Sequence, residues 1–124
     1  MKMLRILMVF IFVFSGNVWA EGFNKNWLGT WTREYASRFD ISRMEIFYNT
    51  ENSFLFKINA SYGANTGSVS GIALIKDNFA IFYDDEDGMI EFIHENNKIL
   101  LKPNIRMPKY AGMGVEFDGI FIGI

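Results

Sequence analysis

The sequence predicts an all-β protein, a small antiparallel up-and-down meander of about eight strands that closes into a barrel. Two observations predict it. Runs rich in Ile, Phe, Val, Tyr and Thr alternate with clusters of Asn, Asp, Gly and Pro, as strands alternate with turns. After the N-terminal segment, no stretch sustains the 3.6-residue apolar period of an amphipathic helix. Closure into a barrel removes the exposed edges that a meander would otherwise leave.

Six turn clusters divide the chain, and each is rich in residues that favour tight turns. They are Asn49–Asn52, Gly63–Gly67, Lys76–Asn78, Asp84–Gly88, Glu95–Asn97 and Pro103–Asn104. The expected strands are Trp27–Glu34, Arg43–Tyr48, Ser53–Ala60, Ser68–Ile75, Phe79–Tyr83, Met89–His94, Lys98–Lys102 and Val115–Ile122.

Within these strands, apolar residues recur at every second position, which indicates one core-facing side. Examples are Trp27 and Trp31, then Phe54, Phe56 and Ile58, then Val115, Phe117 and Phe121. Five apolar residues fall on the expected outer side instead: Phe47, Leu55, Ile72, Leu74 and Phe82. A register error at a bulge is the favoured explanation. The alternative is an outer wall covered by the N-terminal segment or by a partner.

The first twenty residues have the pattern of a cleavable secretory signal peptide. Lys2 and Arg5 are basic, Ile6–Phe14 is apolar, and Val18–Ala20 has small residues where the peptidase needs them. The apolar run is about half the roughly 20 residues that a membrane-spanning helix requires. We therefore expect cleavage near Ala20, one domain over residues 21–124, no membrane span after cleavage, and a periplasmic or secreted product.

Composition excludes several classes of function. With Lys2 and Arg5 removed, 10 basic and 14 acidic residues remain, so the exported chain carries a net charge of −4. An acidic domain without a basic stripe is a poor nucleic-acid binder, and its charge favours cationic partners. The absence of Cys excludes thiol nucleophiles, thiolate metal sites and disulfides, so the barrel must be stabilised by packing.

No catalytic residue, metal ligand set or cofactor motif is predicted. His94 is the one histidine, expected in a surface or capping role, and no serine lies in a nucleophile-elbow context. Glu116 and Asp118 share a strand face, but the sequence supplies no opposite wall for a pair of glycosidase acids. The acidic run Asp84–Asp87 suggests either a calcium loop or a solvated hairpin turn. The EF-hand spacing fails, so the hairpin is favoured.

Two groups of residues are candidates for binding. Five aromatic residues could line an apolar pocket or simply fill the core, and core packing is favoured: Trp27, Trp31, Phe54, Phe56 and Phe117. The connection Pro103–Gly114 is long, holds both prolines of the chain, and carries Arg106, Lys109 and Tyr110. Loops on a rigid barrel are where binding residues concentrate, so these three are candidate partner contacts.

Two stretches resemble a family of small bacterial exported β-domains related to lysozyme-inhibitor-like periplasmic proteins. Lys57–Lys76 resembles the family's Asn/Gly-rich turn followed by a Thr-Gly-x-x-x-Gly strand, and Tyr62 and Asn65 on that turn join the candidate partner contacts. Tyr110–Phe121 is similar to the closing Tyr-Cys-Gly-x-x-Val-x-Phe-Asp-Gly-x-Tyr. The chain has Ala111 and Gly88 where the family often has cysteines. The opening Trp27–Trp31 is also similar to the first strand of lipocalin-type barrels.

The resemblance implies a small exported β-barrel. Together with the acidic charge, it leads to the hypothesis of a non-catalytic protein-binding module of the cell envelope. Such a module would act as a lysozyme-inhibitor-like or immunity protein, with a cationic hydrolase as its partner. The alternative hypothesis is a lipocalin-like carrier that holds a small apolar ligand inside the barrel.

Overall fold

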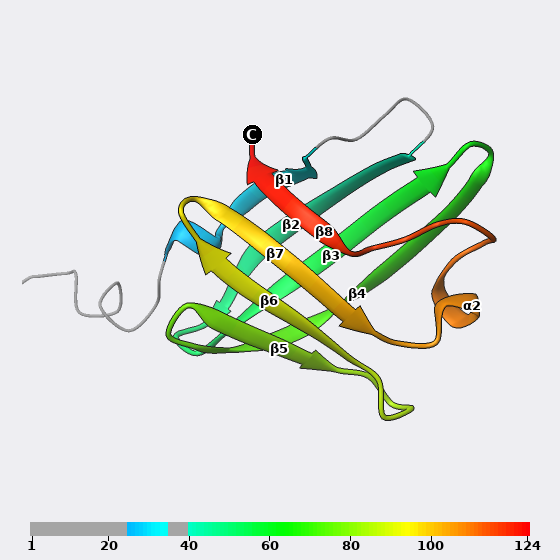
Figure 1. Cartoon of the computed structure of the whole chain (residues 1–124). Helices are drawn as coiled ribbons and strands as arrows, with labels where there is room; N and C mark the ends of the chain where they lie inside the picture. Colours follow the sequence, from blue (N-terminus) through cyan, green and yellow to red (C-terminus); the bar gives the residue numbers. More distant parts are fainter. Residues whose placement is uncertain (1–24, 35–39) are drawn as a thin grey trace, which may run out of the picture.

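The computed structural model describes residues 25–34 and 40–124, which form a closed barrel of eight antiparallel strands (Figure 1). Each strand pairs with the next one along the chain, and β1 closes the barrel against β8. The predicted antiparallel all-β barrel is thus confirmed, while the predicted leader, residues 1–20, lies outside the described residues. The strands are β1 (Gly29–Arg33), β2 (Asp40–Thr50), β3 (Ser53–Tyr62), β4 (Asn65–Lys76), β5 (Phe79–Tyr83), β6 (Met89–Glu95), β7 (Lys98–Asn104) and β8 (Gly119–Gly123).

Two short helical turns accompany the strands in the part of the chain that the structure describes. A 3-10 helix, η1 (Lys25–Trp27), occupies the start of the first predicted strand, and α2 (Met107–Tyr110) lies in the predicted loop between β7 and β8. β8 begins at Gly119 rather than at the predicted Val115. The alternation from Val115 to Asp118 is nevertheless real, because Val115 and Phe117 are buried while Glu116 and Asp118 are exposed. This segment is extended without being paired in the sheet.

The turns use the residues that the sequence offers for them. Asp77, Asp87, Asn96 and Asn97 all have a positive φ, between 52° and 65°. Asp and Asn tolerate this left-handed conformation better than other residues with a Cβ, and tight hairpins require it. The acidic run is therefore a hairpin turn, as the sequence favoured, and its backbone closes where the N–H of Asp84 donates to the carbonyl of Gly88 at 2.9 Å.

Aromatic side chains fill much of the barrel interior. Trp27 contacts Phe54 with ring centroids 5.1 Å apart, and Phe54 contacts Phe92 at 5.3 Å. Phe56 continues the chain, at 5.0 Å from Phe92 and 5.1 Å from Phe82. The Trp27–Phe54 pair is tilted, whereas the other three pairs are edge-to-face. Edge-to-face packing adds to the hydrophobic gain from burial, which matters in a barrel without disulfides.

The expected register error does not explain the apolar residues on the outer side. Phe47, Leu55 and Ile72 are direct partners across β2, β3 and β4, and their side chains are 52%, 39% and 47% exposed. The single register shift of β2 and β3 lies beyond them, between Tyr48 and Thr50. With Leu74, which is 55% exposed, they form an outward apolar row. Cover by a partner or by the N-terminal segment stays a prediction.

Phe82 is the exception, because it faces inward. Lys76 pairs with Phe79 across the two-residue turn, so both lie on the outer side, and the inner positions of β5 are Ala80 and Phe82. The Phe82 ring fills the space beside Gly71, where an added Cβ would be 2.4 Å from the ring. The alternation in the sequence had predicted Phe82 on the outer side, and this prediction is wrong.

The two ends of the barrel differ. At one end lie η1 and the short turns that follow β2, β4 and β6 (Figure 1). At the other, on the right of Figure 1, lie the β3–β4 and β5–β6 turns, the start of β2, and the connection 105–118 that carries α2. We call this second end the loop end.

Candidate functional site

The connection 105–118 covers the loop end and packs against β4. Val115 and Phe117 are buried in the core, 3% and 0% exposed. Ala111 forms an isolated bridge with Gly67, and the N–H of Gly112 donates to the carbonyl of Thr66 at 3.0 Å. A Cβ on residue 67 would be 2.3 Å from that of Ala111, so the connection can lie this close only because residue 67 is glycine.

α2 is fixed to the acidic β5–β6 turn. The Tyr110 hydroxyl donates to Oδ2 of Asp84 at 2.7 Å, and Nζ of Lys109 forms an ion pair with Asp85. Asp84 also accepts hydrogen bonds at its Oδ1 from the N–H groups of Glu86, at 2.9 Å, and Gly88, at 2.6 Å. The backbone of Glu86 and then the Tyr110 hydroxyl lower the pKa of Asp84 below its ordinary value. Burial and this carboxylate raise the pKa of Tyr110.

The structure places all five predicted partner contacts at the loop end, but four of them make internal contacts. Nδ2 of Asn65 donates to the carbonyl of Met113 at 2.8 Å, and the Tyr62 ring lies against Gly114. Lys109 and Tyr110 hold the acidic turn. Arg106 precedes α2 as its N-cap and is exposed, without a side-chain capping bond. Whether these residues contact a partner stays a prediction.

The loop end contains a hollow that the sequence did not predict. It has a volume of about 230 Å³ and is lined by Pro103, Ile105, Met107, Glu116, Phe117 and Asp118. Its floor is apolar, and its two carboxylates are adjacent. A hydrogen bond shared with Asp118 and the repulsion between the two groups raise the pKa of Glu116 above its ordinary value. The sequence indicated that Glu116 and Asp118 share a face. It did not indicate that apolar residues would lie beside these two carboxylates.

Arg33 connects this hollow to the start of β2. Its Nη2 donates to the Glu116 carbonyl at 2.6 Å, and its Nη1 donates to Oδ1 of Asp40 at 3.0 Å. The Arg33 side chain is 11% exposed, so its charge is largely used within the protein. The sequence gives no local signal for this contact, because Arg33 and Glu116 are 83 positions apart.

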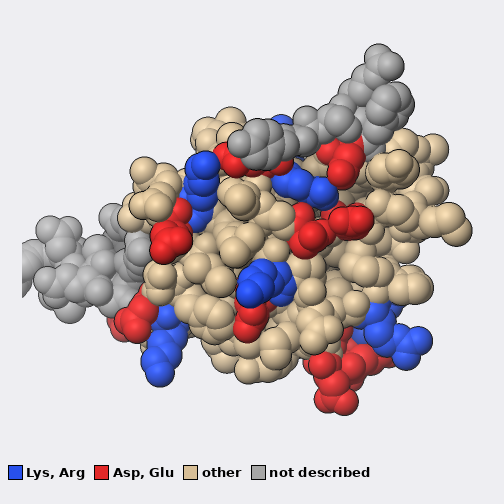
Figure 2. Space-filling view, in the orientation of Figure 1, with Lys and Arg blue, Asp and Glu red and all other residues tan. Residues whose placement is uncertain are grey.

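Acidic side chains are concentrated at the loop end. Figure 2 shows a red group over the β5–β6 turn with blue side chains beside it. Within residues 25–34 and 40–124, the loop end has seven acidic residues, Asp40, Asp84, Asp85, Glu86, Asp87, Glu116 and Asp118, against three basic ones, Arg33, Arg106 and Lys109. Elsewhere, the described side chains include six acidic ones, Glu34, Glu45, Glu51, Asp77, Glu91 and Glu95, and five basic ones, Arg43, Lys57, Lys76, Lys98 and Lys102.

The five aromatic residues proposed to line a pocket are all buried, at 0–5% exposure. Four of them lie at the η1 end or among the aromatic rings that contact one another inside the barrel, and Phe117 lies at the loop end. His94 is half-buried near η1, with its ring 5.2 Å from that of Trp27 and its Nε2 3.1 Å from the Asn26 carbonyl oxygen. Ligand binding among these rings stays a prediction.

Within residues 25–34 and 40–124, no helix is long and apolar enough to cross a membrane. In the same part of the chain, no three His, Asp or Glu side chains are grouped to hold a metal ion. Comparison of the chain with protein-family models, with curated proteins and with solved structures found no match.

Proposed function

We propose that this protein is an exported, non-catalytic binding module of the cell envelope that binds a cationic protein through its loop end. The observation that carries the proposal is the hollow beside Glu116 and Asp118. It combines an apolar floor with two adjacent carboxylates, in the part of the molecule that holds the excess of acidic side chains.

A lysine or arginine side chain has the chemistry that this hollow requires. Its aliphatic stem would lie on Ile105 and Met107, and its charged group would reach the two carboxylates. A cation there would also relieve the repulsion between Glu116 and Asp118, which raises the pKa of Glu116 in the free protein. The acidic β5–β6 turn would attract the same partner from a distance.

Three further features support a binding role over catalysis. His94 lies against Trp27 and Trp31 near η1, away from the loop end, so the hollow has no imidazole to act as a base. The connection 105–118 is held by the Gly67–Ala111 bridge and by the acidic turn, which favours a preformed binding surface. The leader pattern and the family resemblance favour export, with a cationic hydrolase such as lysozyme as the first partner to test.

The electrostatic part of the proposal can be tested with two matched aspartates. Asp87 and Asp77 both lie in hairpin turns with φ near 60°, at the loop end and at the opposite end respectively. Asn suits this conformation equally well, so Asp87→Asn and Asp77→Asn each remove one charge at little structural cost. We expect Asp87→Asn to slow association with a cationic lysozyme by about two- to threefold at low salt and Asp77→Asn to leave it unchanged.

Stopped flow measures these association rates. At rising salt, the wild-type association rate should fall toward that of Asp87→Asn. Equal effects of the two variants would refute a role for the loop end. If the protein neither binds nor slows the lysozyme at low salt, the inhibitor form of the proposal is refuted. Binding to another cationic hydrolase with the same dependence on Asp87 would preserve the module and change its partner.

A further inference from the structure

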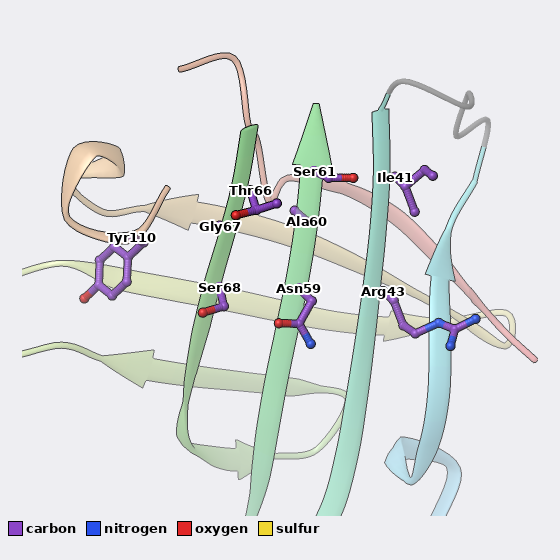
Figure 3. A pocket seen from close by; sticks show the side chains of 9 residues that line it. All are labelled: Ile41, Arg43, Asn59, Ala60, Ser61, Thr66, Gly67, Ser68 and Tyr110. Atoms are coloured by element: carbon purple, nitrogen blue, oxygen red, sulfur yellow. The ribbon is translucent and has the colours of Figure 1, made fainter. Parts of the chain in front are cut away.

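A second hollow lies on the outer wall of the barrel, over β2, β3 and β4. It has a volume of about 620 Å³ and is open to solvent; Figure 3 shows the side chains that line it. Its volume is in the range of about 300–1,000 Å³ that is typical of small-molecule sites. This hollow is separate from the one at the loop end and shares no lining residue with it.

The lining side chains come in two rows that the strand register aligns. Arg43, Asn59 and Ser68 are direct partners across the three strands, and Ile41, Ser61 and Thr66 form the next row toward the loop end (Figure 3). The residues between these positions point into the barrel. The wall therefore presents an amide and three hydroxyls close together on paired strands, and the Arg43 side chain extends from β2 on the side away from Asn59 (Figure 3).

Arg43 is the one charged side chain among the lining residues. It is exposed and makes no ion pair or hydrogen bond with any described residue, in contrast to Arg33, which is bound to Asp40 and Glu116. A guanidinium with free donors can bind a carboxylate through two parallel hydrogen bonds. The hollow is thus suited to a ligand with one anionic group near Arg43 and polar groups around it.

Tyr110 forms the side of the hollow beyond the edge of β4 (Figure 3). Its hydroxyl is already bound to Asp84, so the ring is held in place and offers its carbon surface. The Gly67–Ala111 bridge sets how closely this ring approaches β4. A fixed aromatic ring beside hydroxyl and amide groups suits a sugar, whose ring carries both C–H and O–H groups.

A peptide fits this hollow less well. Every residue of β3, the middle strand of the floor, is paired with β2 on one side and with β4 on the other, so this strand has no free backbone groups for an added strand. Recognition must then come from the side chains, which are mostly neutral hydrogen-bonding groups. We propose that the outer-wall hollow binds an acidic saccharide, with its carboxylate on Arg43 and its hydroxyls on Asn59, Ser61, Thr66 and Ser68.

The test is an NMR titration of the purified protein with trigalacturonic acid, its neutral methyl ester and triglutamate. We expect saturable shifts of the backbone amides around Asn59 and Ser68 with the acid, and at least tenfold weaker binding of the ester. Arg43→Gln should weaken binding of the acid by about tenfold or more. Lys57→Gln removes an exposed cation from the same wall, outside the lining of the hollow, and should change the affinity by less than twofold.

Four outcomes would overturn the proposal: no saturable binding of trigalacturonic acid, equal binding of its ester, equal losses in the two variants, or triglutamate binding as tightly as the sugar. Arg43 is on the outer surface, so the variant should fold, and its unfolding midpoint checks this. A result here leaves the lysozyme experiment unaffected, because Asp87 and Arg43 belong to different surfaces.

Discussion

At the scale of single residues, two buried serines show how hydrogen bonding decides the value of a polar group. Ser42 is fully buried on the inner side of β2, and its hydroxyl has no partner among the described residues. Ser53 is 4% exposed, and its hydroxyl is bonded to Asn49 at 2.9 Å and to Thr50 at 2.6 Å. Burial of the Ser42 hydroxyl thus costs desolvation free energy that no hydrogen bond offsets. At Ser53, hydrogen bonds offset the same cost.

We therefore predict opposite effects of one substitution at the two sites. Ser42→Ala should raise the free energy of unfolding by up to about 1 kcal/mol, because it removes an unpaired buried hydroxyl. Ser53→Ala should lower it by about 1–2 kcal/mol, because Asn49 and Thr50 lose their partner. Urea denaturation of both variants measures the two values, and a destabilised Ser42→Ala would show that its hydroxyl is paired in solution.

Gly67 gives a second prediction at this scale. In Gly67→Ala the new Cβ would be 2.3 Å from the Ala111 Cβ and 2.9 Å from its Cα, so the connection 105–118 must move. We expect a loss of about 1–3 kcal/mol in unfolding free energy, typical of overpacking. Gly123→Ala is the control, since its nearest neighbour would be 3.7 Å away in ordinary contact, and it should be close to neutral. Equal losses of unfolding free energy in both variants would refute the view that the close approach to Ala111 requires glycine at position 67.

Several residue roles could be predicted from the sequence because they depend on near neighbours. The left-handed Asp77, Asp87 and Asn97 follow from the conformational preferences of Asp and Asn in short turns. The inward position of Phe82 did not follow, since it depends on the exact pairing of Lys76 with Phe79. Such a one-residue difference reverses every side chain of a strand.

At the scale of elements, the contact between α2 and the acidic turn should depend on pH. The pKa of Asp84 is lowered in the folded protein, so its carboxylate stabilises the fold at pH values above its unfolded pKa of about 3.9. This contribution is lost as the pH falls through the still lower folded value. We predict that Asp84→Asn is less stable than wild type at pH 7 and that the difference narrows below about pH 4.

Urea denaturation of both proteins at pH 7 and near pH 3 measures this. Asp77→Asn is the comparison, because the Asp77 carboxylate takes part in none of the hydrogen bonds or ion pairs described for residues 25–34 and 40–124. A difference between wild type and Asp84→Asn that stays constant with pH would mean that its charge is not what holds α2.

The outward apolar row gives a prediction about strands. Leu55 and Ile58 are both aliphatic residues of β3, but Leu55 is 39% exposed and Ile58 is fully buried. Leu55→Thr should change the unfolding free energy by less than about 1 kcal/mol, whereas Ile58→Thr should cost about 2–4 kcal/mol. Chemical denaturation distinguishes them. A large loss in Leu55→Thr would show that the row is covered in solution.

The strands themselves were predictable because alternation and turn chemistry act over a few residues. β5 has the predicted bounds, and β6 and β7 extend them by one and two residues. The hollow at the loop end was not predictable. It needs Pro103 at the end of one strand, Met107 in α2 and Glu116 in an unpaired segment to meet, and no local pattern encodes such a meeting.

At the scale of the whole molecule, the two proposed binding surfaces, the loop end and the outer wall, lie on different sides of the barrel. Among the described residues, the loop end holds seven acidic ones against three basic ones, while the outer wall over β2 to β4 carries Arg43, whose side chain has no partner in that part of the chain. A cationic protein and an anionic sugar would then approach different sides and need not compete. We expect saturating trigalacturonic acid to leave the association rate with a cationic partner unchanged within about twofold, as measured by stopped flow.

The order of the strands also determines how the barrel assembles. Every neighbouring pair except one is joined by a direct connection, and most of these hairpins can form within microseconds. The exception is β1 with β8, whose ladder runs only from Trp31–Gly123 to Arg33–Phe121 and must bring the two ends of the chain together. Because of the entropy of that closure, we expect this pair to form last in folding. Weakening this seam should therefore speed unfolding more than it slows folding, and the barrel should open there first.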